Sequence, residues 1–328
     1  MVDEILKKIK DANSIIIIGH VSPDGDCLGC QFGLKEIIKD SFNKKDVYVV
    51  GETSESLKFM GDLDNIDDSV FSKSLIVLVD VANEERIGDK RYKLAPDIVK
   101  IDHHPYSDNT GSSIYVDTNV SSASEIIARI AIDNNLKINE YAANSLLTGI
   151  ITDSGGFRFS GVSDKTFMIA SKLLTCGADP IRLNKEISMV TFNELKIKGY
   201  VIDNMKKTSE GFVYCYISKA TRDIYNVSYE EASNAISTLA NIYGCPVWAL
   251  FLEIDDELRI RLRSNGPVIN LLAKEYGGGG HALASGCHLK NMGEEENLKL
   301  IEKFASDADK VIKKYKEENK LWFMKKWK

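Results

Sequence analysis

The chain has 328 residues, which fits one large domain or two ordinary ones of roughly 100–200 residues each. Hydrophobic residues make up 44% and charged residues 27%, with only 6 prolines, a composition that excludes disordered and collagen-like proteins. A formal net charge of −6 argues against a protein that coats nucleic acid through bulk positive charge. The longest aliphatic run covers only residues 15–18, against the ~20 apolar residues of a membrane span, and no signal peptide precedes it. We therefore expect a cytoplasmic protein.

The first half of the chain alternates short β-rich runs with helical patterns. Several of the runs are almost entirely apolar, which is typical of strands buried on both faces of a parallel sheet. The expected strands cover residues 14–19, 46–50, 75–81, 97–101 and 113–116. The expected helices cover residues 29–39, 124–134, 140–152 and 164–176, the last with Asp164 as its N-cap. This pattern predicts an α/β fold with a parallel sheet flanked by helices.

The pattern changes after Pro180, where a long helical stretch at roughly 181–207 is expected to connect two domains. The elements expected beyond it are strands at 212–218, 246–254 and 257–263 and helices near 229–243 and at 268–276. The Asp255-Asp256 step between two of these strands indicates a hairpin. We therefore predict a catalytic domain at 1–180, a connector helix at 181–210, and a smaller α/β domain with a mixed sheet at 211–328.

Two further segments leave alternatives open. The aromatic and basic end of the chain, residues 321–328, is either a membrane-surface anchor or a docked or frayed tail. Cys27 and Cys30 form a C-x-x-C pattern that can be redox-active or half of a zinc site. However, no second such pair exists, and the 6 scattered cysteines fit a reducing compartment.

Acidic and histidine residues gather at four places where a predicted strand or helix ends. In an open α/β sheet, ligands bind at the carboxyl ends of the strands. A single aspartate at such a place is usually a helix N-cap or a turn former, but three of the 5 histidines lie in these clusters. The members of the clusters are His20, Asp24 and Asp26; Asp80; Asp102, His103 and His104; and Asp153.

These imidazole and carboxylate groups would repel one another on one face of a sheet unless cations were present. With no converging thiolates, the set suits Mn²⁺ or another borderline-to-hard divalent ion, and it is large enough for two ions. Two ions ~3.5–4 Å apart clamp the attacking and leaving oxygens of a phosphoryl displacement and generate a hydroxide near neutral pH. Phosphoester hydrolysis is therefore the leading hypothesis.

The second half of the chain carries a glycine run at residues 277–280, followed by His281. Consecutive glycines let backbone N–H groups approach an anion without interference from side chains. Nearby, Arg261 and Arg263 alternate along one face of a predicted strand. Taken alone, these features also fit a flexible turn beside a solvated strand edge. Next to a phosphoesterase domain they favour phosphate binding.

The ordered motifs resemble those of the DHH phosphoesterase superfamily. His20-x-x-Pro23-Asp24-Gly25-Asp26, Asp80, Asp102-His103-His104 and Asp153-Ser154-Gly155 resemble its four motifs in order. Residues 277–287 resemble the Gly-Gly-Gly-His substrate-binding motif of its DHH-associated C-terminal domain. Together these segments span nearly the whole chain.

The resemblance implies a site with two divalent metal ions, Mn²⁺ or alternatively Mg²⁺. It assigns His20 and Asp24 to one ion, Asp26, His103 and Asp153 to the other, and Asp80 to both. It implies that His104 faces the substrate as a phosphate contact or a proton donor, and that Asp102 orients a histidine. The substrate contacts that we expect, by motif or by nearness to one, are Arg158, Arg263, Ser264, Asn265, Gly278, Gly279, Gly280 and His281.

Length and the C-terminal motif are typical of the stand-alone nano-RNase type within this superfamily. The expected substrates are oligoribonucleotides of about two to five nucleotides, linear diadenylate, and 3′-phosphoadenosine 5′-phosphate, gripped by the C-terminal domain across an interdomain cleft. We expect neither a long duplex nor a membrane as partner, and the resemblance permits a homodimer. The alternatives are a RecJ-like single-strand exonuclease, a cyclic di-AMP phosphodiesterase and a non-catalytic nucleotide sensor.

Overall fold

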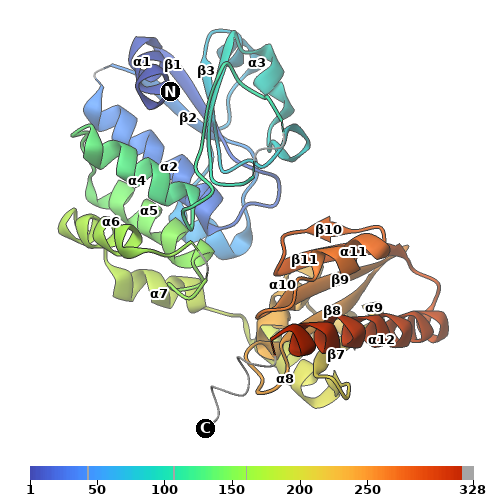
Figure 1. Ribbon diagram of the computed structural model, residues 1–328. Helices are drawn as coiled ribbons and strands as arrows, with labels where there is room; N and C mark the ends of the chain where they lie inside the picture. The colour runs from blue at the N-terminus through green and yellow to red at the C-terminus, as the bar shows by residue number, and fades with distance from the viewer. Residues whose placement is uncertain (43, 106–107, 160, 320–328) are drawn as a thin grey trace. The chain divides into compact units, whose positions relative to one another are not determined.

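The computed structural model describes residues 1–42, 44–105, 108–159 and 161–319. The chain forms two compact units, Met1–Met189 and Val190–Lys328 (Figure 1). The end segment 321–328, for which we weighed a membrane anchor against a docked or frayed tail, lies outside the described residues. Within the described part of the chain, no helix combines the length and the apolar character that crossing a membrane requires.

The first unit is built on a five-stranded parallel sheet, which confirms the predicted α/β class. Its strands lie in the order β2-β1-β3-β4-β5, and every residue of β1 and β3 is buried. The parallel ladders fix the register, with Ile15 opposite Val47 on one side and opposite Leu75 on the other. The strands are β1 (Ser14–Ile18), β2 (Asp46–Val50), β3 (Leu75–Val79), β4 (Asp97–Asp102) and β5 (Ser113–Val116).

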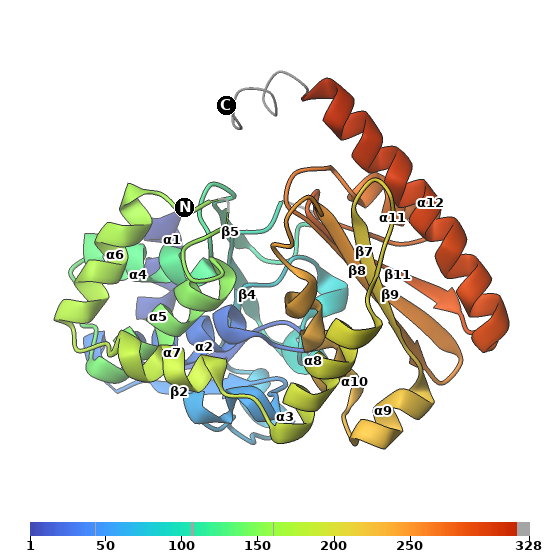
Figure 2. The same cartoon turned by 90° about the horizontal axis from the view of Figure 1, so that it is seen from below.

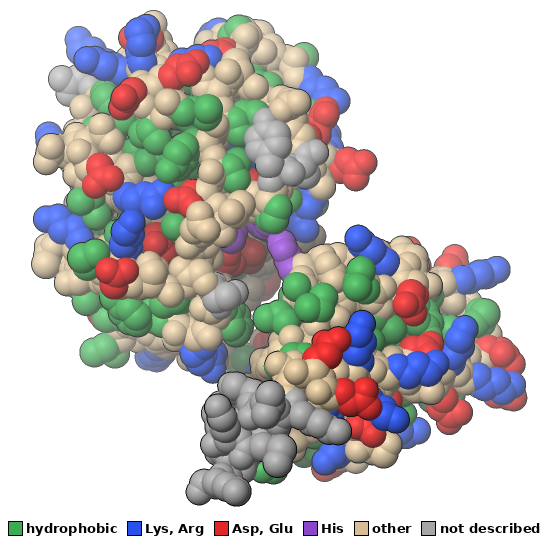
Figure 3. Space-filling model, in the orientation of Figure 1, with side chains coloured by type: hydrophobic (Ala, Val, Ile, Leu, Met, Phe, Trp, Pro, Cys, Tyr) green, Lys and Arg blue, Asp and Glu red, His purple; other side chains and the backbone are tan. Residues whose placement is uncertain are grey.

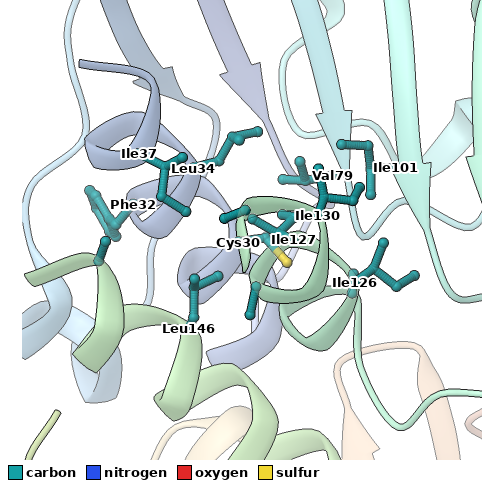
Figure 4. Packing of buried hydrophobic residues seen from close by; sticks show 14 of the residues in the cluster. Cys30, Phe32, Leu34, Ile37, Val79, Ile101, Ile126, Ile127, Ile130 and Leu146 are labelled. Atoms are coloured by element: carbon teal, nitrogen blue, oxygen red, sulfur yellow. The ribbon is translucent and has the colours of Figure 1, made fainter. Parts of the chain in front are cut away.

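Two hydrophobic layers cover the two faces of this sheet, because alternate strand residues point to opposite sides. Ile15 and Ile17 pack with the helices of the larger layer, part of which Figure 4 shows from close by. Ile16 and Ile18 pack on the other face with Phe71 of α3 (Asp68–Phe71). The helices of the larger layer are α1 (Val2–Asp11), α2 (Gly25–Ser41), α4 (Ala123–Asp133), α5 (Glu140–Asp153), α6 (Asp164–Thr175) and α7 (Pro180–Ser188).

Helices α2, α4 and α5 meet at small residues. A Cβ atom on Gly29 of α2 would lie 2.6 Å from the backbone oxygen of Ser145 in α5. A Cβ atom on Gly149 of α5 would lie 2.1 Å from the Ser124 hydroxyl of α4. Both distances are too short for a real contact, so glycine is required at both positions for the helices to approach this closely. The close approach brings the first turn of α2, the first turn of α4 and the last turn of α5 to the same edge of the sheet.

The prediction of a single connector helix at residues 181–210 is wrong. Two helices occupy this stretch, α7 and α8 (Phe192–Asn204), and they belong to different units. Thr191 ends the continuity because its backbone is extended, with φ −71° and ψ 160°, and it forms a capping box with Glu194. The Glu194 N–H donates to the Thr191 hydroxyl at 3.1 Å, and the Thr191 N–H donates to the Glu194 carboxylate at 2.7 Å. In the same way, Ser163 and not Asp164 is the N-cap of α6.

The second unit contains a mixed six-stranded sheet, as predicted, in the order β10-β11-β9-β8-β7-β6. Strands β7 and β8 run parallel and the other neighbouring pairs antiparallel, with β8 and β9 joined by a hairpin at Asp255-Asp256 as expected. The strands are β6 (Lys206–Lys207), β7 (Phe212–Ile217), β8 (Val247–Ile254), β9 (Glu257–Ser264), β10 (Gly279–Gly280) and β11 (Ala284–Lys290).

Helices pack on both faces of this second sheet (Figure 2). Helices α11 (Asn270–Glu275) and α12 (Glu294–Glu318) cover one face. On the other face, the helix expected near 229–243 is shorter and changes to a 3₁₀ helix that ends at Leu239. The elements of that face are α8, α9 (Lys219–Tyr225), α10 (Tyr229–Asn234) and η4 (Ala235–Leu239).

Candidate metal centre

The structure brings together all six side chains that we predicted to bind metal. They form two groups of three, and within each group the ligand atoms lie within 4.8 Å of one another. A third group of the same kind joins Asp80 and His103 to His104. The first two groups are His20, Asp24 and Asp80, and Asp26, His103 and Asp153.

The site lies at the carboxyl edge of the parallel sheet, where the order of the strands reverses. Strand β1 has β2 on one side and β3 on the other. The chain passes from β1 to β2 in one direction and then crosses back over β1 to reach β3. Such a switch point leaves a crevice outside the carboxyl ends of the strands. His20 follows β1 and Asp80 follows β3, and both are buried.

In the first group, His20 faces two carboxylates. Its Nε2 atom lies 3.4 Å from Oδ2 of Asp80 and 3.7 Å from Oδ2 of Asp24. The other ring nitrogen, Nδ1, lies 2.9 Å from the backbone oxygen of Val21. A carbonyl can only accept, so this contact favours a proton on Nδ1 and leaves Nε2 as the ring nitrogen that faces the acids, as metal ligation requires. Asp24 also caps α2, because its Oδ1 accepts the N–H groups of Asp26 and Cys27 at 3.0 Å.

In the second group, His103 lies between two carboxylates that come from different elements. Its Nε2 atom is 3.2 Å from Oδ2 of Asp153, at the end of α5, and 3.4 Å from Oδ1 of Asp80. Asp26 completes the group and is held by the first turn of α4. It accepts the N–H of Ala123 at 2.7 Å and that of Ser124 at 2.9 Å, at the positive end of the helix dipole.

Asp80 lies between the two groups. Its Oδ2 faces His20, and its Oδ1 faces His103 at 3.4 Å and His104 at 3.5 Å. Asp80 has φ +54°, a left-handed conformation that costs energy for a side chain other than glycine and that occurs often at functional sites. Among the described residues, no hydrogen bond reaches its buried Oδ1. A divalent cation would provide the partner that this carboxylate oxygen lacks.

The crowding of acids also shifts the pKa values at the site. Burial and the nearby carboxylate of Asp80 raise the pKa of Asp26, and burial and Asp26 raise the pKa of Asp153. Burial lowers the pKa of His20, but Asp24 and Asp80 outweigh it and raise that pKa to about 10. Without bound metal, protons held by these groups therefore reduce the negative charge of the cluster. Metal binding displaces protons from such ligands, so this donor set fits divalent cations.

His104 is oriented by Asp102, which is 1% exposed. Asp102 Oδ1 lies 2.8 Å from the ring Nδ1 of His104 and accepts the backbone N–H groups of His103 and His104 at 2.8 and 3.2 Å. We expected Asp102 to orient a histidine, and this geometry identifies that histidine as His104. Arg158, exposed in the loop after α5, donates from Nε to the backbone oxygen of Gly155 at 2.5 Å.

In the second unit, Arg263 lies on the face of β9 that also carries Arg259 and Arg261. Arg261 donates to the Ser233 hydroxyl at 2.6 Å, and Arg259 pairs with Glu257 at 2.9 Å. For Arg263, no ion pair occurs among the described residues. Burial and the neighbouring Arg261 lower the pKa of Arg263 to about 10. A half-buried guanidinium that lacks an acid is suited to an anionic ligand.

The glycine run at residues 277–280 is needed for packing, in addition to its predicted role in binding an anion. A Cβ atom on Gly278 would lie 2.1 Å from the backbone oxygen of Gly286, and one on Gly280 would lie 2.7 Å from that of Ala284. These two glycines therefore allow β10 to pair closely with β11. A Cβ atom on Gly279 would meet nothing within 4 Å, so the backbone is open to a ligand there. His281 is exposed, and its backbone forms a turn with Ala284.

Ser264 and Asn265, the other predicted contacts, hold the loop at the end of β9. Ser264 accepts the Gly266 N–H on its hydroxyl at 3.1 Å. Asn265 donates from its side chain to that of Asn241 at 3.0 Å. Their roles in substrate binding stay predictions.

Comparison with known proteins identifies the family. The model of the DHH family, N-terminal domain, matches residues 14–150, and that of the DHHA1 domain matches residues 210–314. The bifunctional oligoribonuclease and PAP phosphatase NrnA of Bacillus subtilis is 36% identical over 301 residues, which are 91% of this chain and 96% of that protein. The chain belongs to the DHH family. An NrnA relative from Streptococcus mutans is 40% identical over 90% of this chain and 95% of its own.

A solved DHH-type fold covers both units. The crystal structure of an exopolyphosphatase-related protein from Bacteroides fragilis matches with a TM-score of 0.87 at 25% identity. The match covers 95% of this chain and 97% of that one. The recognition of a DHH domain followed by its associated C-terminal domain is therefore confirmed.

Cys27 and Cys30 do not belong to the candidate metal groups of the described residues in this DHH domain. Both are free and buried on α2, and the Cys27 sulfur accepts the backbone N–H of His20 at 3.3 Å. The Cys30 sulfur lies 3.3 Å from the Ser124 hydroxyl and 3.7 Å from Oδ1 of Asp26. The two cysteines therefore pack next to His20 and Asp26, two of the proposed ligands.

One neighbour of the DHH site, Lys100, was missed in the sequence, whereas Arg86 was weighed as a phosphate contact or a surface residue because it lies near a motif. Lys100 is buried on β4 beside Asp102, and Arg86 places Nη2 3.3 Å from Nδ1 of His20. A lysine inside an otherwise apolar strand was the available signal for the first. Arg86 is brought to the site by a 3₁₀ turn and an isolated bridge between His20 and Ile87.

Proposed function

We propose that this protein is a two-metal phosphoesterase that hydrolyses short oligoribonucleotides to mononucleotides and 3′-phosphoadenosine 5′-phosphate to AMP. The observation that carries the proposal is the position of Asp80, whose two carboxylate oxygens face the two separate ligand groups. Paired divalent ions are used for displacement at phosphorus. The names of the NrnA relatives, oligoribonuclease and PAP phosphatase, support the substrate classes.

The proposed metals are two Mn²⁺ ions, with Mg²⁺ as the alternative. Imidazole and carboxylate donors without thiolates suit these ions. When bound, the ions supply a hydroxide nucleophile near neutral pH and stabilise the negative charge that develops on the phosphate oxygens. One ion is assigned to His20 and Asp24 and the other to Asp26, His103 and Asp153, with Asp80 shared.

The chain's own residues position the substrate and complete the reaction. We assign to His104, held by Asp102, the donation of a proton to the leaving oxygen. We assign to Arg263 a phosphate contact, because it is a half-buried cation that pairs with no acid among the described residues. Gly279, His281, Ser264, Asn265 and Arg158 are further proposed contacts.

A protein that offers only a few charged contacts to phosphates is better suited to a short substrate than to a long one. On the face shown in Figure 3, basic and acidic side chains are interspersed over both units. Long nucleic acids are bound through many phosphate contacts. We therefore propose substrates of about two to five nucleotides, including linear diadenylate.

The proposal is tested by parallel hydrolysis assays, with Mn²⁺ and with a chelator. The substrates are 5′-phosphorylated diadenylate, a 24-nucleotide RNA, 3′-phosphoadenosine 5′-phosphate, cyclic di-AMP and pyrophosphate. We expect Mn²⁺-dependent release of AMP from diadenylate and from the bisphosphate, with the long RNA nearly unchanged. Preferential cleavage of the long RNA would indicate a RecJ-like exonuclease, and preferential cleavage of cyclic di-AMP a cyclic dinucleotide phosphodiesterase. Tight binding without turnover would indicate a nucleotide sensor.

A further inference from the structure

Lys100 is a buried cation in the middle of strand β4. It is 3% exposed, and its neighbours Val99 and Ile101 are core residues. Lysine is almost never fully buried unless it is paired. The Lys100 ammonium lies 3.4 Å from Oδ2 of Asp102 and 3.8 Å from Oδ1 of Asp108. It also donates to the backbone oxygen of Ala82 at 3.3 Å.

The partners of Lys100 lie on the segments that leave the carboxyl edge of the sheet. Ala82 follows Asp80 by two residues, and Asp108 lies in the loop after His104. Asp108 also accepts the Glu84 N–H at 2.5 Å, which ties the same two segments together a second time. Lys100 therefore joins the segment that follows β3 to the segment that follows β4, next to the candidate metal centre.

The contact with Asp102 links Lys100 to the substrate-facing histidine. One carboxylate oxygen of Asp102 faces Lys100, and the other lies 2.8 Å from Nδ1 of His104. A carboxylate accepts hydrogen bonds on both of its oxygens, so Asp102 contacts the Lys100 ammonium and the His104 ring at the same time. The contact with Lys100 therefore holds the Asp102 carboxylate in the orientation in which it faces the His104 ring.

We propose that Lys100 is a positioning residue for proton transfer to the leaving oxygen, because through Asp102 it fixes the orientation of the His104 ring. This inference rests on the proposed function. In the step concerned, a hydroxide forms a bond to phosphorus while the bond from phosphorus to the ribose oxygen breaks. That oxygen takes a proton from the His104 ring, and solvent water returns a proton to the ring afterwards.

A leaving-group comparison separates this role from a purely structural ion pair. A ribose oxygen needs a proton as it leaves, whereas p-nitrophenolate is stable without one. If Lys100 acts through His104, its loss slows the first reaction and spares the second. If Lys100 only stabilises the fold, its loss affects both reactions equally.

The test variant is Lys100→Met, assayed with Mn²⁺ on 5′-phosphorylated diadenylate and on the p-nitrophenyl ester of AMP. We expect kcat for diadenylate to fall about 10- to 100-fold, the usual effect of removing a group that orients a catalytic one. For the p-nitrophenyl ester we expect a change of less than about twofold. The matched control is Lys35→Met, which removes the ion pair with Asp64 (2.6 Å) about 15 Å along α2 from its first turn. It should leave both reactions unchanged.

A second readout needs no turnover. The chain has 5 histidines, so ¹⁵N spectra of the ring nitrogens can be assigned. In the metal-free protein we expect the His104 Nδ1 signal to differ between the wild type and Lys100→Met, because loss of Lys100 disturbs the contact of Nδ1 with Asp102. Equal loss on both esters, or an unchanged His104 signal, would overturn the proposal.

A variant with less effect on packing keeps the test decisive if Lys100→Met does not fold. Asp102→Asn preserves the shape of the side chain and removes the charge that links Lys100 to His104. We expect it to show the same selective loss on diadenylate, and equal loss on both esters would again overturn the proposal. A wild-type protein that hydrolyses neither ester would instead contradict the proposed function itself.

Discussion

Oδ1 of Asp26 accepts a hydrogen bond from the backbone N–H of Ser124 at 2.9 Å. A proposed metal ligand on α2 is thus held by the first turn of α4. Gly149 of α5 packs against both, since a Cβ atom there would lie 2.1 Å from the Ser124 hydroxyl and 2.7 Å from Oδ1 of Asp26. The position of the ligand therefore depends on how closely three helices pack.

The first prediction concerns this junction. Gly149→Ala should displace Asp26 or Ser124 and lower both Mn²⁺ affinity and stability, with a loss of about 1–3 kcal/mol in the free energy of unfolding. Gly199→Ala in α8 is the matched control, because a Cβ atom there meets nothing within 4 Å. At that partly exposed helix position, alanine should be neutral or stabilise by up to about 1 kcal/mol. Denaturant unfolding and calorimetric Mn²⁺ titration measure both effects, and identical behaviour of the two variants would show that the junction is not tight.

The second prediction concerns the shared carboxylate. Asp80→Ala and Asp80→Asn should each lower kcat/KM for diadenylate more than tenfold, a loss above ~1.4 kcal/mol, because both metal groups lose a ligand. Asparagine tolerates the left-handed backbone at this position (φ +54°), so Asp80→Asn should keep the wild-type fold. Circular dichroism checks the fold, and steady-state assays check the rate. If either variant retained more than a tenth of kcat/KM, the bridging role of Asp80 would be wrong.

The third prediction concerns metal removal. Mn²⁺ binds the folded site and not the unfolded chain, so it should stabilise the protein by about 2.7 kcal/mol when its concentration is 100 times Kd. The melting temperature should rise with added Mn²⁺ and fall again with excess chelator. In Asp80→Asn the rise should be much smaller. A wild-type melting temperature that does not respond to Mn²⁺ or Mg²⁺ would contradict the metal centre.

The core of the first unit was predictable because its strands have one dominant signal. The aliphatic runs of β1 and β3 are typical of strands that are buried on both faces of a sheet. The carboxyl ends of parallel strands meet at one edge, so an acid or histidine after each strand places it at the site. This reasoning located His20, Asp80 and His103 from the sequence.

Other features depend on tertiary contacts that the local sequence does not encode. Strand β11 contains Gly286 and few residues with strong strand preference, and it forms because it pairs along its whole length with β9. The burial of Lys100 depends on acids from two other places in the chain, Asp102 and Asp108. The break between α7 and α8, in contrast, had a readable signal in the Thr191-x-x-Glu194 capping box, which the helical pattern around it obscured.

The last prediction concerns Arg263 in the second unit. Arg263→Ala should raise KM for diadenylate about tenfold or more, because a charged hydrogen bond to phosphate contributes about 1.5–3 kcal/mol. It should leave kcat nearly unchanged, because the contact is equally strong in the ground state and in the transition state. Arg259→Ala is the matched control on the same face of β9, since Arg259 already pairs with Glu257 and lies over the Tyr229 ring. Its KM should stay close to that of the wild type. Steady-state kinetics on both variants decide the point, and an unchanged KM in Arg263→Ala would remove this residue from the substrate site.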